Sequence, residues 1–199
     1  TRRLLRGLRA GFTVEQFTED LLEHQLTGRL LRYDPKTKQV SRIADGFSFL
    51  NGVALGPDQT WGAAAEMGAY RLWKIFVKGP DAGKKVLFTD SLPGFPDNVK
   101  YSKERRVFWV AIGSPRNPLV DDLAGKPWVR SLIPKLPKAV QPAPERHGYA
   151  LAIGEDGKPV ESLQHRAPDS YSPVASVLER DGWLYLGSFR VGGVARVKL

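Results

Sequence analysis

Three side chains with oxygen donors stand at the starts of two predicted strands in this 199-residue chain. Asn51 comes directly before Gly52, and Asp97 with Asn98 follows the turn-like sequence PGFP and precedes Val99. Two amides and a carboxylate are hard oxygen ligands, which suit Ca²⁺ or Mg²⁺ rather than zinc. A glycine beside Asn51 allows another backbone to approach closely. Asn-Gly and Asp-Asn are also common turn pairs, so turn chemistry is the alternative interpretation.

Several other chemistries are excluded by residue content. The chain has no cysteine, which rules out disulfides, thiolate nucleophiles and cysteine-based metal sites. Its three histidines, His24, His147 and His165, do not have metal-ligand spacing. His147 opens a predicted strand and could face a channel as a base, although a packing or surface role is favoured. Ser114 and Ser188 have no histidine or acid beside them in sequence, so nothing supports a serine-hydrolase triad.

The chain is basic, with 30 Lys and Arg residues against 21 Asp and Glu residues and a formal charge of +9. A nucleic-acid-binding protein would combine a basic stripe with a module signature or stacking aromatics, and neither is found. We therefore expect a solvated basic surface and no nucleic-acid partner. Contact between residues 126–138 and a membrane surface is the alternative. The longest apolar runs fall far short of the roughly 20 residues of a membrane-spanning helix.

The elements that would position these residues are β-strands. Short runs rich in Val, Ile, Tyr, Phe and Trp alternate with turn sequences. Asn51 and Asp97 lie 46 residues apart, close to the roughly 40–50 residues of a four-stranded propeller blade. The innermost strands of neighbouring blades run side by side around a channel, so their first residues converge there. The predicted strands are 28–33, 39–43, 51–55, 60–66, 70–77, 84–89, 97–101, 107–112, 149–153, 159–163, 174–178, 183–188 and 193–199.

Two segments do not follow the blade pattern. Residues 1–27 form an N-terminal segment, which is either helical, with Thr13 as its N-cap, or part of an earlier blade. Residues 114–146 form an insertion between strands, in which apolar residues from Trp128 to Leu136 recur at helical spacing. We predict a short amphipathic helix over one mouth of the propeller, with its apolar side covering the blades. Membrane contact by that side is the alternative.

Five stretches of the chain resemble the strictosidine synthase-like family: GRLLRYDPKTKQV, FLNGVALGPDQTWGAAAEMG, PGFPDN, KPWVRSLIPKLP and SPVASVLERDGWLYLGSFR. The resemblance covers residues 28–199 and implies a six-bladed β-propeller. The superfamily includes paraoxonases, gluconolactonases and phosphotriesterases that bind calcium in the channel, and Asn51, Asp97 and Asn98 match metal-ligand positions. The resemblance also implies that this all-β chain is the C-terminal half of a propeller, about three blades. The family's other ligands, a Glu and an Asn on earlier blades, have no counterpart here.

The resemblance also bears on the reaction. The catalytic Glu of strictosidine synthase corresponds to Ala175, whose methyl group cannot transfer a proton, so true strictosidine synthase activity is not expected. We expect calcium-dependent hydrolysis of a small ester or lactone, of the arylesterase or lactonase type, with Asp97 as catalytic base or nucleophile. The alternative is a non-catalytic membrane-associated interaction module or an inactive fragment, which could self-associate. Membrane-associated members of the family imply a location in the endomembrane system or secretory pathway.

Overall fold

The computed structural model describes residues 3–7, 17–123, 129, 132–133 and 145–199. These residues form four antiparallel sheets with the orders β1-β2-β3, β4-β5-β6-β7, β11-β10-β9-β8 and β12-β13-β14. The strands are β1 (Arg3–Gly7), β2 (Gly28–Asp34), β3 (Gln39–Phe47), β4 (Leu50–Leu55), β5 (Trp61–Glu66), β6 (Arg71–Phe76), β7 (Lys85–Thr89), β8 (Gly94–Ser102), β9 (Val107–Pro115), β10 (Gly148–Gly154), β11 (Pro159–His165), β12 (Ser176–Arg180), β13 (Trp183–Gly187) and β14 (Ala195–Lys198).

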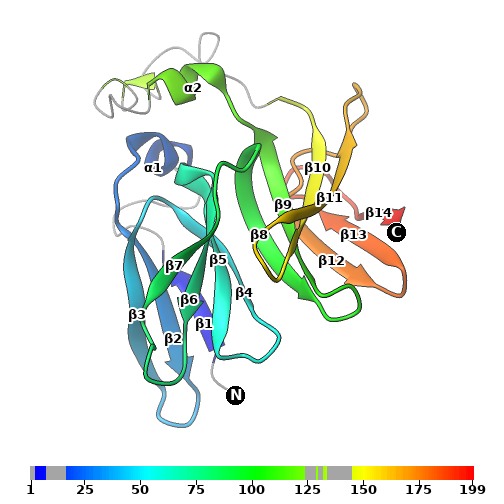
Figure 1. Ribbon diagram of the computed structural model, residues 1–199. Coiled ribbons are helices and arrows are strands. Elements are labelled where there is room, and N and C mark those ends of the chain that lie inside the picture. The colour runs from blue at the N-terminus through cyan, green and yellow to red at the C-terminus, as the bar shows by residue number, and fades with distance from the viewer. Residues whose placement is uncertain (1–2, 8–16, 124–128, 130–131, 134–144) are drawn as a thin grey trace.

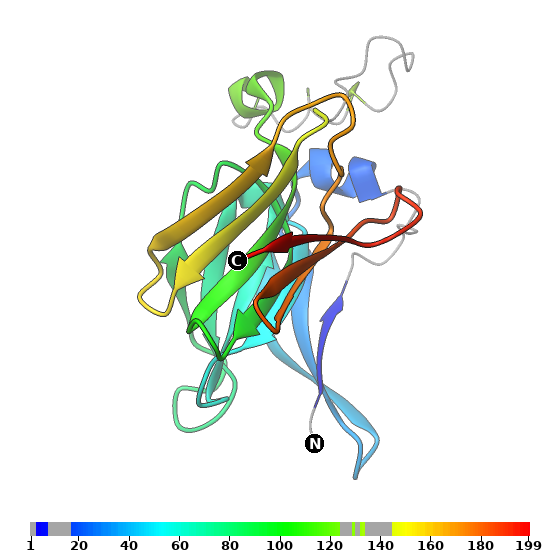
Figure 2. The same ribbon diagram turned by 90° about the vertical axis from the view of Figure 1, so that its right-hand side faces the viewer.

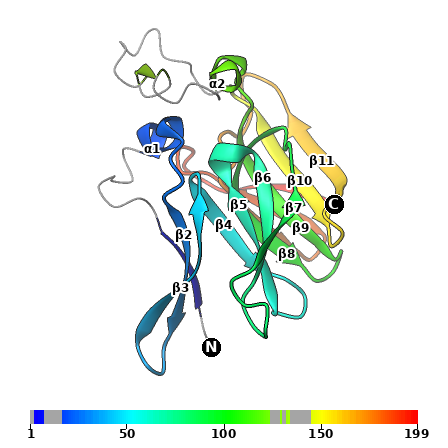
Figure 3. The same ribbon diagram turned by 60° about the vertical axis from the view of Figure 1, so that its left-hand side comes forward.

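Each sheet has its first strand on the inside of the molecule. β1 lies against β4, β4 lies against β8, and β8 lies against β12. The later strands of each sheet extend outward, so the sheets stand side by side as blades (Figures 1 and 3). Figure 2 shows the β12–β14 sheet crossing in front of the others when the molecule is turned. This arrangement is a partial β-propeller, as the sequence predicts.

Among the described residues, three short helices gather at one end of the sheets, which is the upper end in Figure 1. They are α1 (Phe17–Glu23), the 3₁₀ turn η2 (Met67–Ala69) and α2 (Pro118–Asp122), and α1 contacts η2. β4 and β8 begin at this end, because Leu50 pairs with Glu66 just before η2, and Gly94 pairs with Pro115 just before α2. The first residues of these inner strands therefore lie close to the helices. None of the described helices has the length and apolar composition needed to cross a bilayer.

Hydrophobic clusters fill the spaces between neighbouring sheets, and tryptophans contribute to them. Trp61 on β5 packs with Phe88 and Phe108, with ring centroids 5.4 and 5.2 Å away. Trp109 on β9 is fully buried, and its Nε1 donates to Glu179 Oε2 on β12 at 2.6 Å. These contacts join three successive sheets. Trp61 and Trp109 thus pack between neighbouring blades.

The observed strands follow the sequence-based expectation closely, with two differences. The chain forms four sheets rather than about three blades, because β1 from the N-terminal segment pairs with β2 and completes a sheet with β3. β8 begins at Gly94 and includes Pro96, whereas the sequence predicts a turn before residue 97. Its register shifts on both sides of Pro96, the kind of position at which a sheet accepts proline.

The predicted division into residues 1–27, 28–199 and an insertion at 114–146 remains a prediction. The N-terminal segment holds both a strand and a helix, β1 and α1. Most of the predicted insertion helix falls outside the described residues. Of its apolar residues, Ile133 is buried in the same cluster as Trp61, whereas Leu132 is 45% exposed.

Candidate functional site

The backbones of β4 and β8 meet at Gly52. A Cβ atom added to Gly52 would lie 2.5 Å from Asn98 Cα and 2.6 Å from both Asp97 O and Val99 N. Such distances leave no room for a side chain, so glycine is required by close approach and not by turn geometry. The contact brings Asn51, next to Gly52, alongside Asp97 and Asn98. The two inner strands converge here as the sequence predicts, although Asp97 is the fourth residue of β8 and not its first.

Asn51 is held with its amide oxygen unpaired. The residue is only 6% exposed, and its Nδ2 donates to Met67 Sδ at 3.5 Å. Its Oδ1 is buried and has no hydrogen-bond partner in the described part of the chain. An unsatisfied buried acceptor costs about 1–3 kcal/mol, so a cation or a water at this oxygen would stabilise the folded state.

Asp97 lies near the same methionine. The residue is 8% exposed, and its Oδ1 accepts a hydrogen bond from Asn98 Nδ2 at 3.2 Å. Its Oδ2 lies 3.9 Å from the position that a Cβ on Gly113 would occupy, and Met67 Cε lies 3.8 Å from that same position. Asp97 and Met67 therefore share the space left by Gly113 on β9. Because Met67 also contacts Asn51, the amide and the carboxylate lie around one side chain.

Asn98 connects this cluster to the last sheet. Its Nδ2 donates to the Ala175 carbonyl oxygen at 2.7 Å, and its backbone N–H donates to the same oxygen at 3.2 Å. Ala175 directly precedes β12 and is fixed in turn by donating its N–H to Gly187 O at 2.8 Å. Three inner strands thus meet at the candidate site. Ala175 thus binds Asn98 through its backbone carbonyl.

The donor set fits a hard cation. Both amides use their NH₂ groups on protein acceptors, which leaves the buried Asn51 oxygen for a ligand. Ca²⁺ takes six to eight oxygen ligands, so these residues would form part of its coordination sphere. Within the described ranges no three His, Cys, Asp or Glu side chains form a metal-binding group, so the candidate site is built mainly from amides. The ligand roles of Asn51, Asp97 and Asn98 remain predictions.

Glu66, at the end of β5, has a structural role. It is fully buried, and its Oε2 accepts hydrogen bonds from Arg71 Nε and Trp73 Nε1, both at 2.6 Å. Its Oε1 accepts from the backbone N–H of Ser48 at 2.7 Å, and Ser48 Oγ lies 3.0 Å from His24 Nδ1. The ion pair between Glu66 and Arg71 is therefore part of a structural network. It fixes the loop that leads into β4.

His147 is a packing residue, as the favoured interpretation had it. It precedes β10, which pairs with β9 and β11 and is therefore not an inner strand. The residue is 2% exposed and stacks on Tyr149, with ring centroids 5.0 Å apart. Burial lowers the pKa of His147, the charge of Arg166 lowers it further, and Glu145 acts in the opposite direction. The imidazole is therefore buried against Tyr149, next to a strand that does not line the inside of the sheets.

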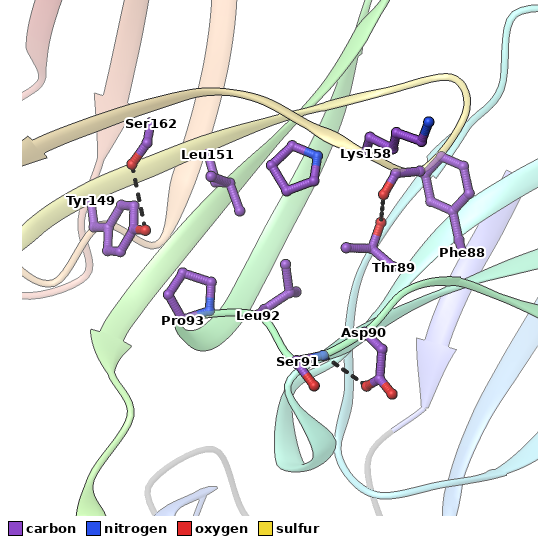
Figure 4. A pocket seen from close by; sticks show the side chains of 12 residues that line it. Phe88, Thr89, Asp90, Ser91, Leu92, Pro93, Tyr149, Leu151, Lys158 and Ser162 are labelled. Carbon is purple, nitrogen blue, oxygen red and sulfur yellow. Dashed lines mark hydrogen bonds between the residues drawn. The ribbon is translucent and has the colours of Figure 1, made fainter.

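A hollow of about 440 Å³ lies between the β7–β8 connection and the β10–β11 hairpin (Figure 4). Its lining is largely apolar, and two of the hydroxyl groups there donate hydrogen bonds within the protein. Thr89 Oγ1 donates to Gly157 O at 2.8 Å, and Ser162 Oγ donates to Tyr149 OH at 3.5 Å. Sequence reasoning missed this hollow because its walls come from two strand connections that only the tertiary structure brings together.

Known sequences similar to this chain include a family profile and several curated proteins. A family profile described as strictosidine synthase matches residues 9–80. Protein STRICTOSIDINE SYNTHASE-LIKE 13 of Arabidopsis thaliana is 39% identical over 73% of this chain and 37% of that protein. Adipocyte plasma membrane-associated protein of Rattus norvegicus is 35% identical, over 86% of this chain and 47% of that protein. This chain thus spans half or less of the length of these curated relatives.

Solved structures show the same fold. A luciferin-regenerating enzyme superimposes with a TM-score of 0.52 and 17% identity, over 81% of this chain and 44% of the other. A calcium-binding protein, regucalcin, from Agrobacterium tumefaciens superimposes with a TM-score of 0.53 and 16% identity, over 84% of this chain and 46% of the other. A gluconolactonase from Xanthomonas campestris superimposes with a TM-score of 0.51 and 14% identity, over 80% of this chain and 41% of the other. With its relatives in sequence and its propeller sheets, this chain belongs to the strictosidine synthase-like family.

Proposed function

We propose that this chain supplies Asn51, Asp97 and Asn98 as ligands for a calcium ion in the propeller channel, and that the whole protein hydrolyses a small ester or lactone. The observation that carries the proposal is the buried, unpaired Asn51 oxygen beside the Asp97 carboxylate and the Asn98 amide. The names of two proteins with a similar fold, a calcium-binding regucalcin and a gluconolactonase, support the same assignment. Because the chain covers about half of its relatives, the activity is proposed for the longer protein.

The chemistry divides between the ion and the chain. A bound divalent cation polarises a carbonyl oxygen and stabilises the negative charge that develops on it during ester hydrolysis. Asp97 is the candidate proton acceptor or nucleophile. Its Oδ1 is oriented by the Asn98 amide, and its Oδ2 points to the space above Gly113, where the lack of a side chain leaves room. Ala175 contributes only its backbone carbonyl, which holds Asn98 in place.

The test removes the carboxylate in the full-length protein. Asp97→Ala should abolish calcium binding, measured by calorimetry, together with hydrolysis of an aryl acetate or a lactone. Asp81→Ala is the matched control, because Asp81 lies on an exposed turn and pairs only with the neighbouring Lys84 at the surface. Activity that survives unchanged in Asp97→Ala would overturn the proposal.

A second candidate function is binding to an anionic membrane surface. The formal charge of +9 favours it, and so does the name of the adipocyte plasma membrane-associated relatives. The basic, tryptophan-containing segment 126–138 proposed for this contact falls largely outside the described residues. Vesicles containing anionic lipid should bind wild-type protein more strongly than a Trp128→Ala/Arg130→Ala variant. Equal binding by the two proteins would remove this segment from consideration.

A further inference from the structure

Met67 is the only methionine of the chain, and it lies beside the candidate site. It opens η2, directly after Glu66, and is 8% exposed. Its sulfur accepts the hydrogen bond from Asn51 Nδ2, and its methyl carbon lies over Gly113 near the Asp97 carboxylate. No motif in the sequence marks this residue, because a Met-Gly pair after a strand reads as an ordinary turn.

The contact with sulfur decides which end of the Asn51 amide faces the candidate ion. An amide presents an NH₂ donor at one end and an oxygen acceptor at the other, and only the oxygen can bind a cation. A thioether sulfur is an acceptor, so it attracts the NH₂ group and repels the oxygen lone pairs. With Nδ2 placed on Met67, Oδ1 is left buried and unpaired.

Asn98 is oriented in the same way by a different acceptor. Its NH₂ group donates to the Ala175 carbonyl and to Asp97 Oδ1. Each amide of the candidate site thus has its nitrogen held by a protein acceptor. For Asn98 that anchor includes a backbone carbonyl, whereas for Asn51 it is the side chain of Met67, which a substitution can change.

The backbone around Met67 holds it over the site. The Met67 N–H donates to Phe49 O at 3.0 Å, and the Gly68 N–H donates to Ser48 O at 3.1 Å. Gly68 packs so closely on Ser48 that a Cβ there would overlap the Ser48 hydroxyl. Tyr70, in the left-handed conformation, ends the turn and donates its N–H to Met67 O at 3.5 Å. Met67 is therefore fixed relative to the start of β4.

We propose that Met67 is a positioning residue, which orients the Asn51 amide so that its oxygen faces the calcium ion. The proposal rests on the proposed function, because it takes Asn51 as a ligand. Residues that hold metal ligands in place typically change metal affinity by about 10–100-fold when they are replaced. A thioether at this position thus contributes to the affinity of the site without touching the ion.

The test uses two variants of the full-length protein. Met67→Leu keeps a similar volume and removes the acceptor, whereas Met67→Gln restores an acceptor on a side chain of similar length. In calorimetric titration with Ca²⁺, Met67→Leu should bind about tenfold more weakly than wild type. Met67→Gln should recover most of the affinity, and the melting temperature without calcium should change little in either variant. Equal affinity of wild type and Met67→Leu would overturn the proposal, as would failure of Met67→Gln to recover affinity.

A spectroscopic measurement separates this proposal from the function on which it rests. Met67 is the one methionine of these 199 residues, and in full-length protein labelled with ¹³C-methyl methionine its resonance is assigned as the one that Met67→Leu lacks. Asn51→Leu should shift that resonance without any metal, and Ca²⁺ should shift it in wild type. If wild type binds no Ca²⁺, the proposed function fails. If wild type binds Ca²⁺ but the Met67 resonance shifts neither with Asn51→Leu nor with Ca²⁺, the proposed role of Met67 is wrong and the proposed function stands.

Discussion

Gly52 is the residue that allows the two inner strands to touch. Backbone atoms of Asp97, Asn98 and Val99 lie 2.5–2.6 Å from where its Cβ would be. These are backbone contacts, so no side-chain rotation can relieve them. The residue therefore sets how closely Asn51 approaches the β8 ligands, and its substitution tests the geometry of the candidate site directly.

We expect Gly52→Ala to destabilise the protein because it forces β4 and β8 apart. Overpacking of this kind costs about 2 kcal/mol, which lowers the melting temperature by about 4–8 °C in a domain of this size. Differential scanning calorimetry measures the shift. Gly192→Ala is the control, because a Cβ at Gly192 would meet nothing within 4 Å. Equal melting temperatures for Gly52→Ala and wild type would show that the strands do not meet as described.

His147 should make stability depend on pH. Its pKa is lowered from 6.5 by burial first and by the charge of Arg166 second, so the folded protein holds it neutral. The unfolded chain binds a proton more readily, so the stabilising contribution is present above about pH 6.5 and is lost as the pH falls. Urea unfolding between about pH 7.5 and 5.5 should show a steeper loss for wild type than for His147→Gln. The exposed His165→Gln variant should behave like wild type, and the same pH dependence in all three proteins would contradict this account.

At the scale of elements, one buried carboxylate ties together the loop before β4 and the strands β5 and β6. Glu66 accepts hydrogen bonds from Ser48, Arg71 and Trp73, and all three donors lie on segments that position η2 and the start of β4. Glu66 is fully buried and the Arg71 side chain is 31% exposed, so removing the carboxylate would leave its donors without a partner. This network keeps the ends of the inner strands in register with the 3₁₀ turn.

Glu66→Ala should therefore destabilise the protein by about 2–4 kcal/mol, since it leaves three donors without their acceptor. Urea denaturation gives the free energy of unfolding. Glu104→Ala, on an exposed turn between β8 and β9, should change it by less than about 0.5 kcal/mol. If the two variants lose similar amounts, the carboxylate does not organise this end of the sheet.

Sequence patterns predicted most strands because alternating apolar residues and turn sequences are local signals. Sequence patterns do not predict features that depend on contacts between residues far apart in the chain. β1 belongs to the first sheet only because it pairs with β2, and Pro96 concealed the start of β8 behind turn-like sequence. In the candidate site, the ligand types of Asn51 and Asp97 were visible in the sequence. Met67 was not, because its role depends on a contact between η2 and β4.

At the scale of the whole molecule, the chain forms four sheets of a propeller and spans half or less of its curated relatives. The last sheet, β12–β14, has one face against Trp109 and an outward face that carries Leu178, 52% exposed, and Trp183 with Arg196 packed over its ring at 4.2 Å. Self-association through uncovered sheet surfaces remains a prediction of the sequence analysis. Light scattering across a range of protein concentrations measures it.

The fold brings donors from separate blades together, so their contributions to ion binding should be coupled. Calcium titration of wild type, Asn51→Leu, Asp97→Ala and the double variant tests this most directly. We expect each single variant to lose most of the affinity, and the double variant to lose much less than the sum of the two losses, because both donors serve one ion. Calcium binding that is unchanged in Asn51→Leu and in Asp97→Ala, or absent from wild type, would contradict a shared calcium site.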